Sequence, residues 1–247
     1  MRKLLKKTKA LAAAVALTSG VLALSISSSN IHNKYLRYEV GSSTVKVLGP
    51  RGGGSGFAVK GDSGKDYIMT NKHVCELATG GWLSVKSDSG LTLWKRVVYK
   101  DNIHDLCLIE GDSRFDSLSI GSTPSPGDYF YIVGHPALRA LTVSQGEYIG
   151  FANVTIVDDS VKERSQCRGT VYELTPLEQM EFGIEWACIR SLRSYSTTAV
   201  AYGGNSGSPV VNQYGNLIGV LFAGSTQQER DNYVVPLHEV KRVLSKF

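Results

Sequence analysis

The stretch GGNSGSP at residues 203–209, which runs into the apolar pair Val210 and Val211, decides how this chain is interpreted. Glycines flank Ser206 just before an apolar strand. A nucleophilic serine needs a tight turn that exposes its hydroxyl, and backbone N–H groups aimed at the oxyanion that forms when it attacks a carbonyl. We expect Gly204 and Ser206 to supply these N–H groups, since glycine permits the unusual backbone angles. The alternative is an ordinary glycine-rich hairpin turn.

A serine hydroxyl is a weak nucleophile at its own pKa, so a base has to lie beside it. His73 ends the segment YIMTNKH, an apolar strand followed by a polar turn, which favours presentation of its imidazole to a cleft. A structural role is the alternative for any lone histidine, and His104 is the rival base. The other histidines lie beside the N-terminal segment, in a GHP turn and near the C-terminus: His32, His135 and His238.

The base in turn needs a carboxylate to orient its far nitrogen. Asp105 opens the segment DLCLIE and stands directly before an apolar strand. Burying a carboxylate is costly without a partner, and a histidine would be such a partner. Asp101 is the rival, but it lies in the preceding polar turn, which favours Asp105.

These segments resemble those of trypsin-like serine peptidases, in which His, Asp and Ser follow in this order. The spacings, 32 residues from His73 to Asp105 and 101 from Asp105 to Ser206, are similar to those of that superfamily. The segments SGFAVK (55–60), PGDYFYIVGHP (126–136) and TVSQGEYIG (142–150) resemble bacterial HtrA-type peptidases. The segment at 203–220 also resembles glutamyl endopeptidases. The resemblance covers the chain from about residue 44 onward.

The resemblance implies an all-β, chymotrypsin-like fold of two six-stranded antiparallel barrels with the active site between them. It implies that the protein is a serine endopeptidase. His73 would take the proton of Ser206 and later protonate the leaving amine, Asp105 would hold the imidazole tautomer, and water would hydrolyse an acyl-enzyme on Ser206. This chemistry needs no cofactor and no metal. We expect no PDZ domain, because no segment follows the C-terminal helix.

The pattern along the chain agrees with an all-β fold. From residue 43 onward, short apolar runs alternate with glycine and polar turns, which predicts about a dozen short strands. Leu237, Val240 and Leu244 recur at helical spacing and predict a short C-terminal helix. We therefore expect a signal peptide or anchor at 1–28, a linker at 29–42, a first barrel at 43–121, an interbarrel linker at 122–128, and a second barrel with the helix at 129–247.

The first 28 residues have the layout of a targeting segment. A basic head without acidic residues precedes an apolar run that begins at Ala10. This order is typical of a secretory signal peptide, and Ala23 and Ser25 suit a cut before Ile26. The run is also near the lower length limit for a membrane span, so a retained anchor is the alternative. We expect an exported protein, periplasmic or secreted, that contacts a membrane only if this segment is retained.

Charge excludes one class of partner. The chain carries 27 basic and 22 acidic residues, a net charge of +5, but five of the basic residues and none of the acidic ones precede Ile26. The remainder is neutral, which removes the electrostatic case for nucleic-acid binding. The expected partner is a protein or peptide substrate. The oligomeric state stays open.

The four cysteines are Cys75, Cys107, Cys167 and Cys188. No CxxC pair occurs, so a zinc ribbon is unsupported. Disulfides persist in exported proteins. Cys167 and Cys188 lie in one region, and Cys75 and Cys107 each follow a predicted catalytic residue by two positions. The alternative for each is a small buried apolar side chain, and the pairing stays open.

The neighbours of Ser206 depart from the family pattern. Digestive members have an aspartate at the position of Asn205 that pairs with a freed N-terminal amine; we expect no such dependence here. Apolar residues occupy the positions of the charged or hydroxyl groups that select charged P1 residues, which predicts cleavage after small or medium apolar residues. We expect residues 223–225 to pair with the substrate backbone. The alternative is that these residues pack the barrel. The expected substrate-binding residues are Val200, Ala201, Leu221, Phe222, Ala223, Gly224 and Ser225.

A different function remains open, in which the chain keeps a trypsin-like fold as a catalytically silent scaffold or binding protein. The complete set of His73, Asp105 and Ser206, with the flanking glycines, argues against it.

Overall fold

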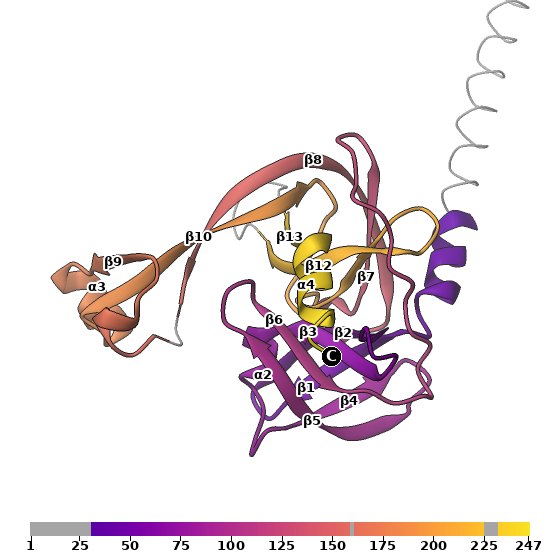
Figure 1. Cartoon of the computed structure of the whole chain (residues 1–247), viewed down its shortest axis with the longest axis horizontal. Coiled ribbons are helices and arrows are strands. Elements are labelled where there is room, and N and C mark those ends of the chain that lie inside the picture. Colours follow the sequence, from indigo (N-terminus) through magenta and orange to yellow (C-terminus); the bar gives the residue numbers. More distant parts are fainter. Residues whose placement is uncertain (1–30, 159–160, 225–231) are drawn as a thin grey trace, which may run out of the picture.

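The first half of the chain forms a closed β-barrel (Figure 1). The computed structural model describes residues 31–158, 161–224 and 232–247. Neighbouring strands are antiparallel in the order β1-β2-β3-β6-β5-β4, and a one-turn helix, α2, follows β3. The elements are β1 (Thr44–Gly49), β2 (Gly52–Lys60), β3 (Asp66–Asn71), α2 (Lys72–Cys75), β4 (Trp82–Ser87), β5 (Thr92–Asp101) and β6 (Leu106–Glu110).

The second half forms a sheet in the order β13-β12-β11-β7-β8-β10-β9, and β10 also pairs with β13. This additional pairing closes six of the strands into a ring and leaves β9 outside it. The prediction of two six-stranded antiparallel barrels with a short C-terminal helix is therefore confirmed. The elements are β7 (Tyr129–Gly134), β8 (Thr142–Val157), β9 (Thr170–Glu173), β10 (Trp186–Thr197), β11 (Pro209–Val211), β12 (Leu217–Gly224), β13 (Asn232–Pro236) and α4 (Leu237–Leu244).

A continuous apolar core joins the two barrels. In β1 and β4, alternate residues point inward, as the twofold period of a strand requires, and fill the first barrel. Strands β2 and β3 are buried on both faces, because their other face packs against the second barrel. Phe57 and Met69 there belong to the same cluster as Val133 and Val220. The two barrels therefore share one apolar cluster.

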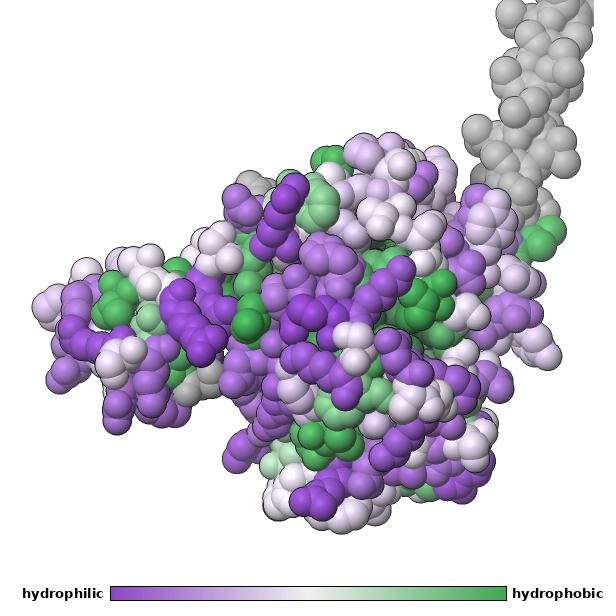
Figure 2. Space-filling model, viewed as in Figure 1, coloured by the Kyte–Doolittle hydropathy of each residue, from purple (hydrophilic) through white to green (hydrophobic). Residues whose placement is uncertain are grey.

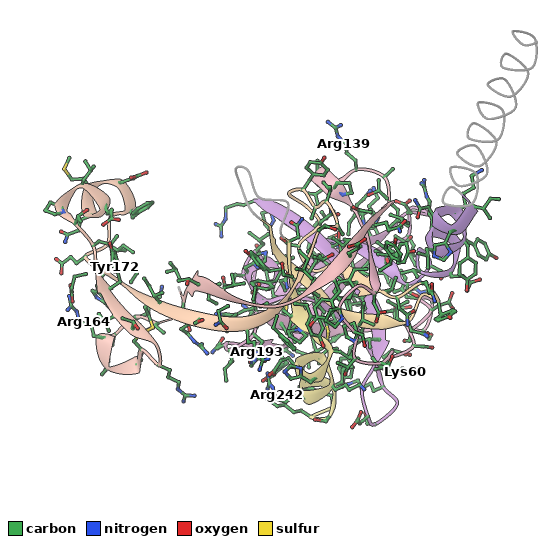
Figure 3. The ribbon with its side chains drawn as sticks, turned by 90° about the horizontal axis from the view of Figure 1, so that it is seen from above. Lys60, Arg139, Arg164, Tyr172, Arg193 and Arg242 are labelled. Atoms are coloured by element: carbon green, nitrogen blue, oxygen red, sulfur yellow. A yellow bond between two sulfur atoms is a disulfide. The ribbon has the colours of Figure 1, made fainter. Side chains whose placement is uncertain are left out.

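An arm projects from the second barrel (Figures 1 and 3). We use this name for residues 157–158 and 161–189, in which β9 and the helix α3 (Pro176–Phe182) extend the β8–β10 hairpin. A disulfide between Cys167 and Cys188 crosses it. The helix has no buried residue, and Leu177 and Met180 are 75% and 85% exposed. Figure 2 accordingly shows apolar surface on the arm.

The sequence patterns did not predict α3, although a local signal exists. Thr175 accepts a hydrogen bond from the Glu178 N–H, and the Glu178 carboxylate accepts one from the Thr175 N–H. With Pro176 at the first helical position, the segment TPLE is a capping box. The helix is only seven residues long, so it produces no long apolar period.

Residues 31–39 form a helix inside the stretch that we expected to be a linker. Leu36 in this helix and Val40 directly after it are buried in the core, and both side chains lie near Gly215. The predicted signal segment at residues 1–28 lies outside the described residues. No helix in the described part of the chain is long and apolar enough to span a membrane.

Candidate active site

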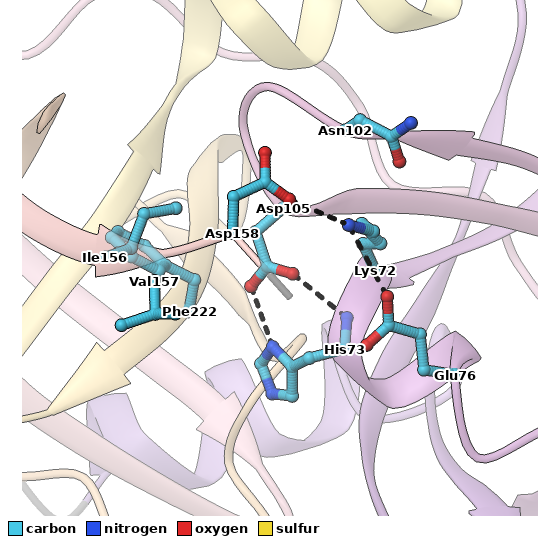
Figure 4. A pocket seen from close by; sticks show the side chains of 9 residues that line it. All are labelled: Lys72, His73, Glu76, Asn102, Asp105, Ile156, Val157, Asp158 and Phe222. Atoms are coloured by element: carbon cyan, nitrogen blue, oxygen red, sulfur yellow. Dashed lines mark hydrogen bonds and ion pairs between the residues drawn. The ribbon is translucent and has the colours of Figure 1, made fainter. Parts of the chain in front are cut away.

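His73 and Asp105 lie against each other at the edge of the first barrel (Figure 4). His73 is in α2, directly after β3, and Asp105 is in the turn between β5 and β6. The His73 Nδ1 atom lies 2.7 Å from Asp105 Oδ2, and the His73 backbone N–H donates to Oδ1 at 3.0 Å. One carboxylate therefore fixes both the ring and the main chain of the histidine.

The backbone around Asp105 is held in an uncommon conformation. Its φ is +54°, in the left-handed region that aspartate tolerates better than most residues. The backbone N–H of Lys72 and the side-chain amide of Asn71 both donate to the Asp105 carbonyl at 3.0 Å. Since Asn71 also pairs with Leu106 in the sheet, the strand that leads to His73 directly fixes the turn that carries Asp105.

The electrostatics of His73 favour its protonated form. Burial disfavours a charged imidazole and is the largest single effect on its pKa. The hydrogen bond and negative charge of Asp105, with the charge of Glu76, together outweigh burial and raise the pKa of His73 above its usual value of 6.5. The ring is 46% exposed, so its other nitrogen is accessible from the cleft. This arrangement suits a group that accepts a proton during a reaction.

The Ser206 loop of the second barrel docks onto the first barrel. The Ser55 N–H donates to the Ser206 carbonyl, and the Ser55 hydroxyl donates to the Gly204 carbonyl, both at 2.8 Å. Within the loop, the Gly207 N–H donates to Leu221, and the Asn205 N–H donates to Tyr202. These bonds form the tight turn that the glycine-rich sequence predicts.

Two close approaches show how near this loop lies to His73. A β-carbon on Gly54 would lie 2.6 Å from the Ser206 carbonyl oxygen and 2.7 Å from a methyl group of Val74, the residue after His73. A β-carbon on Gly207 would lie 2.2 Å from the Thr70 hydroxyl, three residues before His73. Strands β2 and β3 therefore bring Ser206 and His73 to the same end of the cleft.

No hydrogen bond joins the Ser206 hydroxyl to His73 within the described residues. Hydrogen bonds between catalytic groups are often loose without substrate and tighten in the substrate complex. The structure thus pairs two of the predicted residues directly and brings the loop of the third beside them.

Two backbone N–H groups of the Ser206 loop are the predicted oxyanion-hole donors. Among the described residues, the N–H groups of Gly204 and Ser206 donate to no backbone carbonyl. Gly204 has φ +90°, and a β-carbon there would lie 2.7 Å from the His135 carbonyl. The Ala137 N–H donates to the Gly203 carbonyl, which holds the loop against this turn. The arrangement is compatible with an oxyanion hole made from these two donors.

A cavity of about 220 Å³ opens beside His73 and Asp105 (Figure 4). Part of its wall comes from residues 157 and 158, where the arm begins. The Asp158 carboxylate lies 3.8 Å from the Lys72 Nζ atom and 2.9 Å from the Arg190 guanidinium. Its lining residues are Lys72, His73, Glu76, Asn102, Asp105, Ile156, Val157, Asp158 and Phe222.

Of the predicted substrate-binding residues that the structure describes, Phe222 lines this cavity, and its side chain is 6% exposed. Leu221 belongs to the apolar core of the second barrel, and Ala201 packs against that core. Val200 is exposed. Ala223 and Gly224 continue β12, and Ser225 lies outside the described residues.

Asn205 is buried, 3% exposed, directly before Ser206. Its side-chain oxygen accepts no hydrogen bond from the described residues. A β-carbon on Gly134 would lie 2.8 Å from this oxygen and would overlap the Ser208 hydroxyl, so the site is tightly enclosed. An uncharged amide suits such a place, because a buried carboxylate would need a cation.

The four cysteines, whose pairing the sequence left open, form two disulfides. Cys75 bonds to Cys107, which ties α2 to β6 behind the His73–Asp105 pair. Cys167 bonds to Cys188 in the arm. Disulfides are typical of proteins outside the reducing cytosol.

Sequence reasoning missed the residues that support this pair. Ser55, Asn71 and Thr70 act through hydrogen bonds and close contacts that no local pattern reveals. The two rivals, Asp101 and His104, lie together in contact with Arg242 and Glu239 of α4. Only the spacing of Glu239 and Arg242, three residues apart on a predicted helix, gave a signal.

Sequence comparison finds relatives among known peptidases. The Serine protease Do-like HtrB of Bacillus subtilis (strain 168) is 29% identical over 201 residues, which are 78% of this chain and 38% of that protein. The Serine protease Do-like HtrA of the same organism is 24% identical over 204 residues, 79% of this chain and 39% of that protein. The chain spans well under half the length of these curated relatives.

Solved structures share the fold. The active form of the Rv3671c protease from M. tuberculosis has a TM-score of 0.65 at 19% identity, covering 85% of this chain and 83% of the other. A serine endoprotease from Yersinia pestis has a TM-score of 0.62 at 23% identity, covering 85% and 64%. The family model described as trypsin-like peptidase domain matches residues 54–220. The chain therefore belongs to the family of proteins that contain a trypsin-like peptidase domain.

Proposed function

We propose that the protein is a serine endopeptidase that uses His73, Asp105 and Ser206. The observation that carries the proposal is the double contact between His73 and Asp105, at 2.7 and 3.0 Å, on the barrel onto which the Ser206 loop docks through Ser55. A histidine held this way by a carboxylate is the arrangement that activates a serine.

In the proposed reaction, the exposed nitrogen of His73 takes the proton of the Ser206 hydroxyl as its oxygen attacks the scissile carbonyl. Asp105 keeps the other ring nitrogen protonated and stabilises the imidazolium. The N–H groups of Gly204 and Ser206 donate to the oxyanion. His73 then protonates the leaving amine, and water attacks the acyl-enzyme. No cofactor or metal takes part.

Labelling with a fluorophosphonate probe tests this proposal. The purified chain is expected to react at Ser206 and to hydrolyse peptides, whereas Ser206→Ala should do neither. Ser208→Ala, which removes a different serine hydroxyl of the same loop, is the control variant. Failure of the wild-type chain to react, while correctly folded, would support the alternative of a catalytically silent scaffold.

For substrate choice, we propose cleavage after small or medium apolar residues. Leu221 lies in the core of the second barrel and Ala201 packs against that core, so neither offers a charged partner to a P1 side chain, which would lose its hydration without compensation. A peptide library cleaved mainly after Glu, Lys or Arg would refute this preference.

We also propose that activity needs no freed N-terminal amine, because buried Asn205 carries no charge to pair with one. Chains with and without extra N-terminal residues should turn over substrate equally. Export is part of the same proposal: two disulfides and a basic-apolar N-terminal segment support it. The mass of the mature N-terminus distinguishes a cleaved signal from a retained anchor.

A further inference from the structure

Residues 101–105, the last residue of β5 and the turn to β6, carry Asp105 at one end and a buried charge cluster at the other. Asp101 is 3% exposed, and its Oδ1 accepts the Ile103 N–H at 3.0 Å. Its Oδ2 contacts the Arg242 guanidinium of α4. A buried carboxylate persists only with such partners, so α4 fixes the start of this turn.

The cluster contains two further side chains. Glu239, one turn before Arg242 on α4, accepts from Arg242 Nε at 2.5 Å. The Nδ1 atom of His104, within the turn, lies 3.2 Å from the Glu239 carboxylate and 3.0 Å from the Arg242 guanidinium. Burial opposes the charge of Asp101, but hydrogen bonds from His104, the Ile103 N–H and Arg242 outweigh it and lower the pKa of Asp101. Asp101 therefore stays ionised and paired near neutral pH.

A second arginine of the second barrel holds the next residue of the turn. Arg190 of β10 donates to the Asn102 carbonyl at 2.7 Å, and the same nitrogen lies 2.9 Å from Asp158. Arg242 of α4 thus contacts the side chain of Asp101, and Arg190 of β10 donates to the carbonyl of Asn102. Figure 3 shows Arg242 beside the barrels, far from the tip of the arm, where Arg164 and Tyr172 lie.

We propose that Arg242 and Arg190 are positioning residues for the candidate catalytic carboxylate Asp105. Within the first barrel, the Asn71 side chain and the Lys72 backbone N–H hold the Asp105 carbonyl, and His73 contacts its carboxylate. The two arginines hold the opposite end of the turn, so the second barrel, which supplies Ser206, also sets where Asp105 points. This inference rests on the proposed peptidase function, and it adds that the two barrels must be docked for His73 to be oriented.

The test compares the single variants Arg242→Gln and Arg190→Gln with the double variant Arg242→Gln, Asp101→Asn. The double variant removes both charges of the ion pair, so Asp101 does not remain as a buried carboxylate without its arginine. Arg164→Gln is the matched control, because it removes an exposed arginine–glutamate pair in the arm. Each variant is first checked for an intact thermal transition. We expect kcat to fall about tenfold in the Arg242 and Arg190 variants with KM nearly unchanged, because a small displacement of a catalytic group is costly.

Two readouts separate positioning from general damage. The titration of His73, followed by the NMR signal of its imidazole, should move to lower pH in the Arg242 and Arg190 variants, since Asp105 holds that pKa up. In an Asp105→Asn background, the same variants should cause little further loss of kcat, because residues that act through one group are not additive.

An unchanged His73 titration in folded Arg242→Gln and Arg190→Gln would overturn the inference, as would full additivity with Asp105→Asn. The NMR titration does not depend on turnover. A wild-type chain that fails to label at Ser206 would therefore refute the peptidase function, while the titration would still test the positioning of Asp105 by itself.

Discussion

The carboxylate of Asp105 contacts His73 twice, at the ring Nδ1 atom and at the backbone N–H. The histidine is thereby held at its ring and at the start of its own helix. A substitution at Asp105 is expected to disturb both contacts, which distinguishes this site from one in which a carboxylate touches the ring alone.

Asp105→Asn should lower kcat by roughly 10³- to 10⁴-fold, because an amide favours the wrong imidazole tautomer and cannot stabilise the imidazolium. Steady-state kinetics on a peptide substrate measures this loss. Asp101→Asn combined with Arg242→Gln should cost far less. A similar loss in both would mean that general damage to the turn explains the effect.

The pH profile should report the raised pKa of His73. The proposed reaction needs the neutral imidazole, so kcat/KM is expected to rise with pH and to reach its plateau only above the usual histidine pKa of 6.5. Glu76→Gln removes a negative charge that favours the imidazolium, and it should shift the acid limb of the profile to lower pH.

Glu185→Gln, an exposed carboxylate in the arm, is the control for that shift. An acid limb that stays in place in Glu76→Gln would contradict the electrostatic account of His73.

Removing the Cys75–Cys107 disulfide should lower both stability and activity. The bond closes a 32-residue separation, for which a loss of about 2–4 kcal/mol in the free energy of unfolding is typical. Urea unfolding of Cys75→Ala with Cys107→Ala measures it. Activity should fall as well, since the bond ties the helix of His73 to the strand after Asp105.

Cys167→Ala with Cys188→Ala is the matched comparison, because that bond lies in the arm. Its removal should leave kcat largely unchanged. Equal losses of kcat in the two pairs would show that the position of the crosslink does not matter for catalysis.

Gly207→Ala should inactivate the protein. Its φ is +83°, and a β-carbon would lie 2.2 Å from both the Ser55 carbonyl and the Thr70 hydroxyl, so the Ser206 loop would have to move. We expect kcat/KM to fall by about 100-fold or more. Gly203→Ala is the control in the same loop, since its β-carbon would meet nothing within 4 Å. A tolerated Gly207→Ala would argue against close docking of the barrels.

The sequence carried enough information to predict the fold and to propose His73, Asp105 and Ser206 as the catalytic residues, because each lies in a local pattern. Ser206 lies among glycines, His73 and Asp105 flank apolar strands, and their order along the chain matched a known family. The supporting contacts were not predictable in this way. Arg242 reaches Asp101 across 141 positions, and Ser55 reaches Gly204 across 149, so only the docked barrels reveal them.

The arm illustrates the same limit. The sequence patterns predicted only short strands in this half of the chain, because alternation of apolar residues does not show how far a hairpin extends. The length of β8, 16 residues, and the exposure of Leu177 and Met180 emerge only from the three-dimensional arrangement.

The Cys167–Cys188 bond affects how proteolytic cleavage of the arm would be detected. The bond encloses α3, whose exposed apolar side chains Leu177 and Met180 are accessible to a peptidase with the apolar preference that we propose for this chain. A single cut between these cysteines leaves both fragments covalently joined. Such nicked molecules keep the full-length mass, apart from one added water, and separate into two pieces only after reduction.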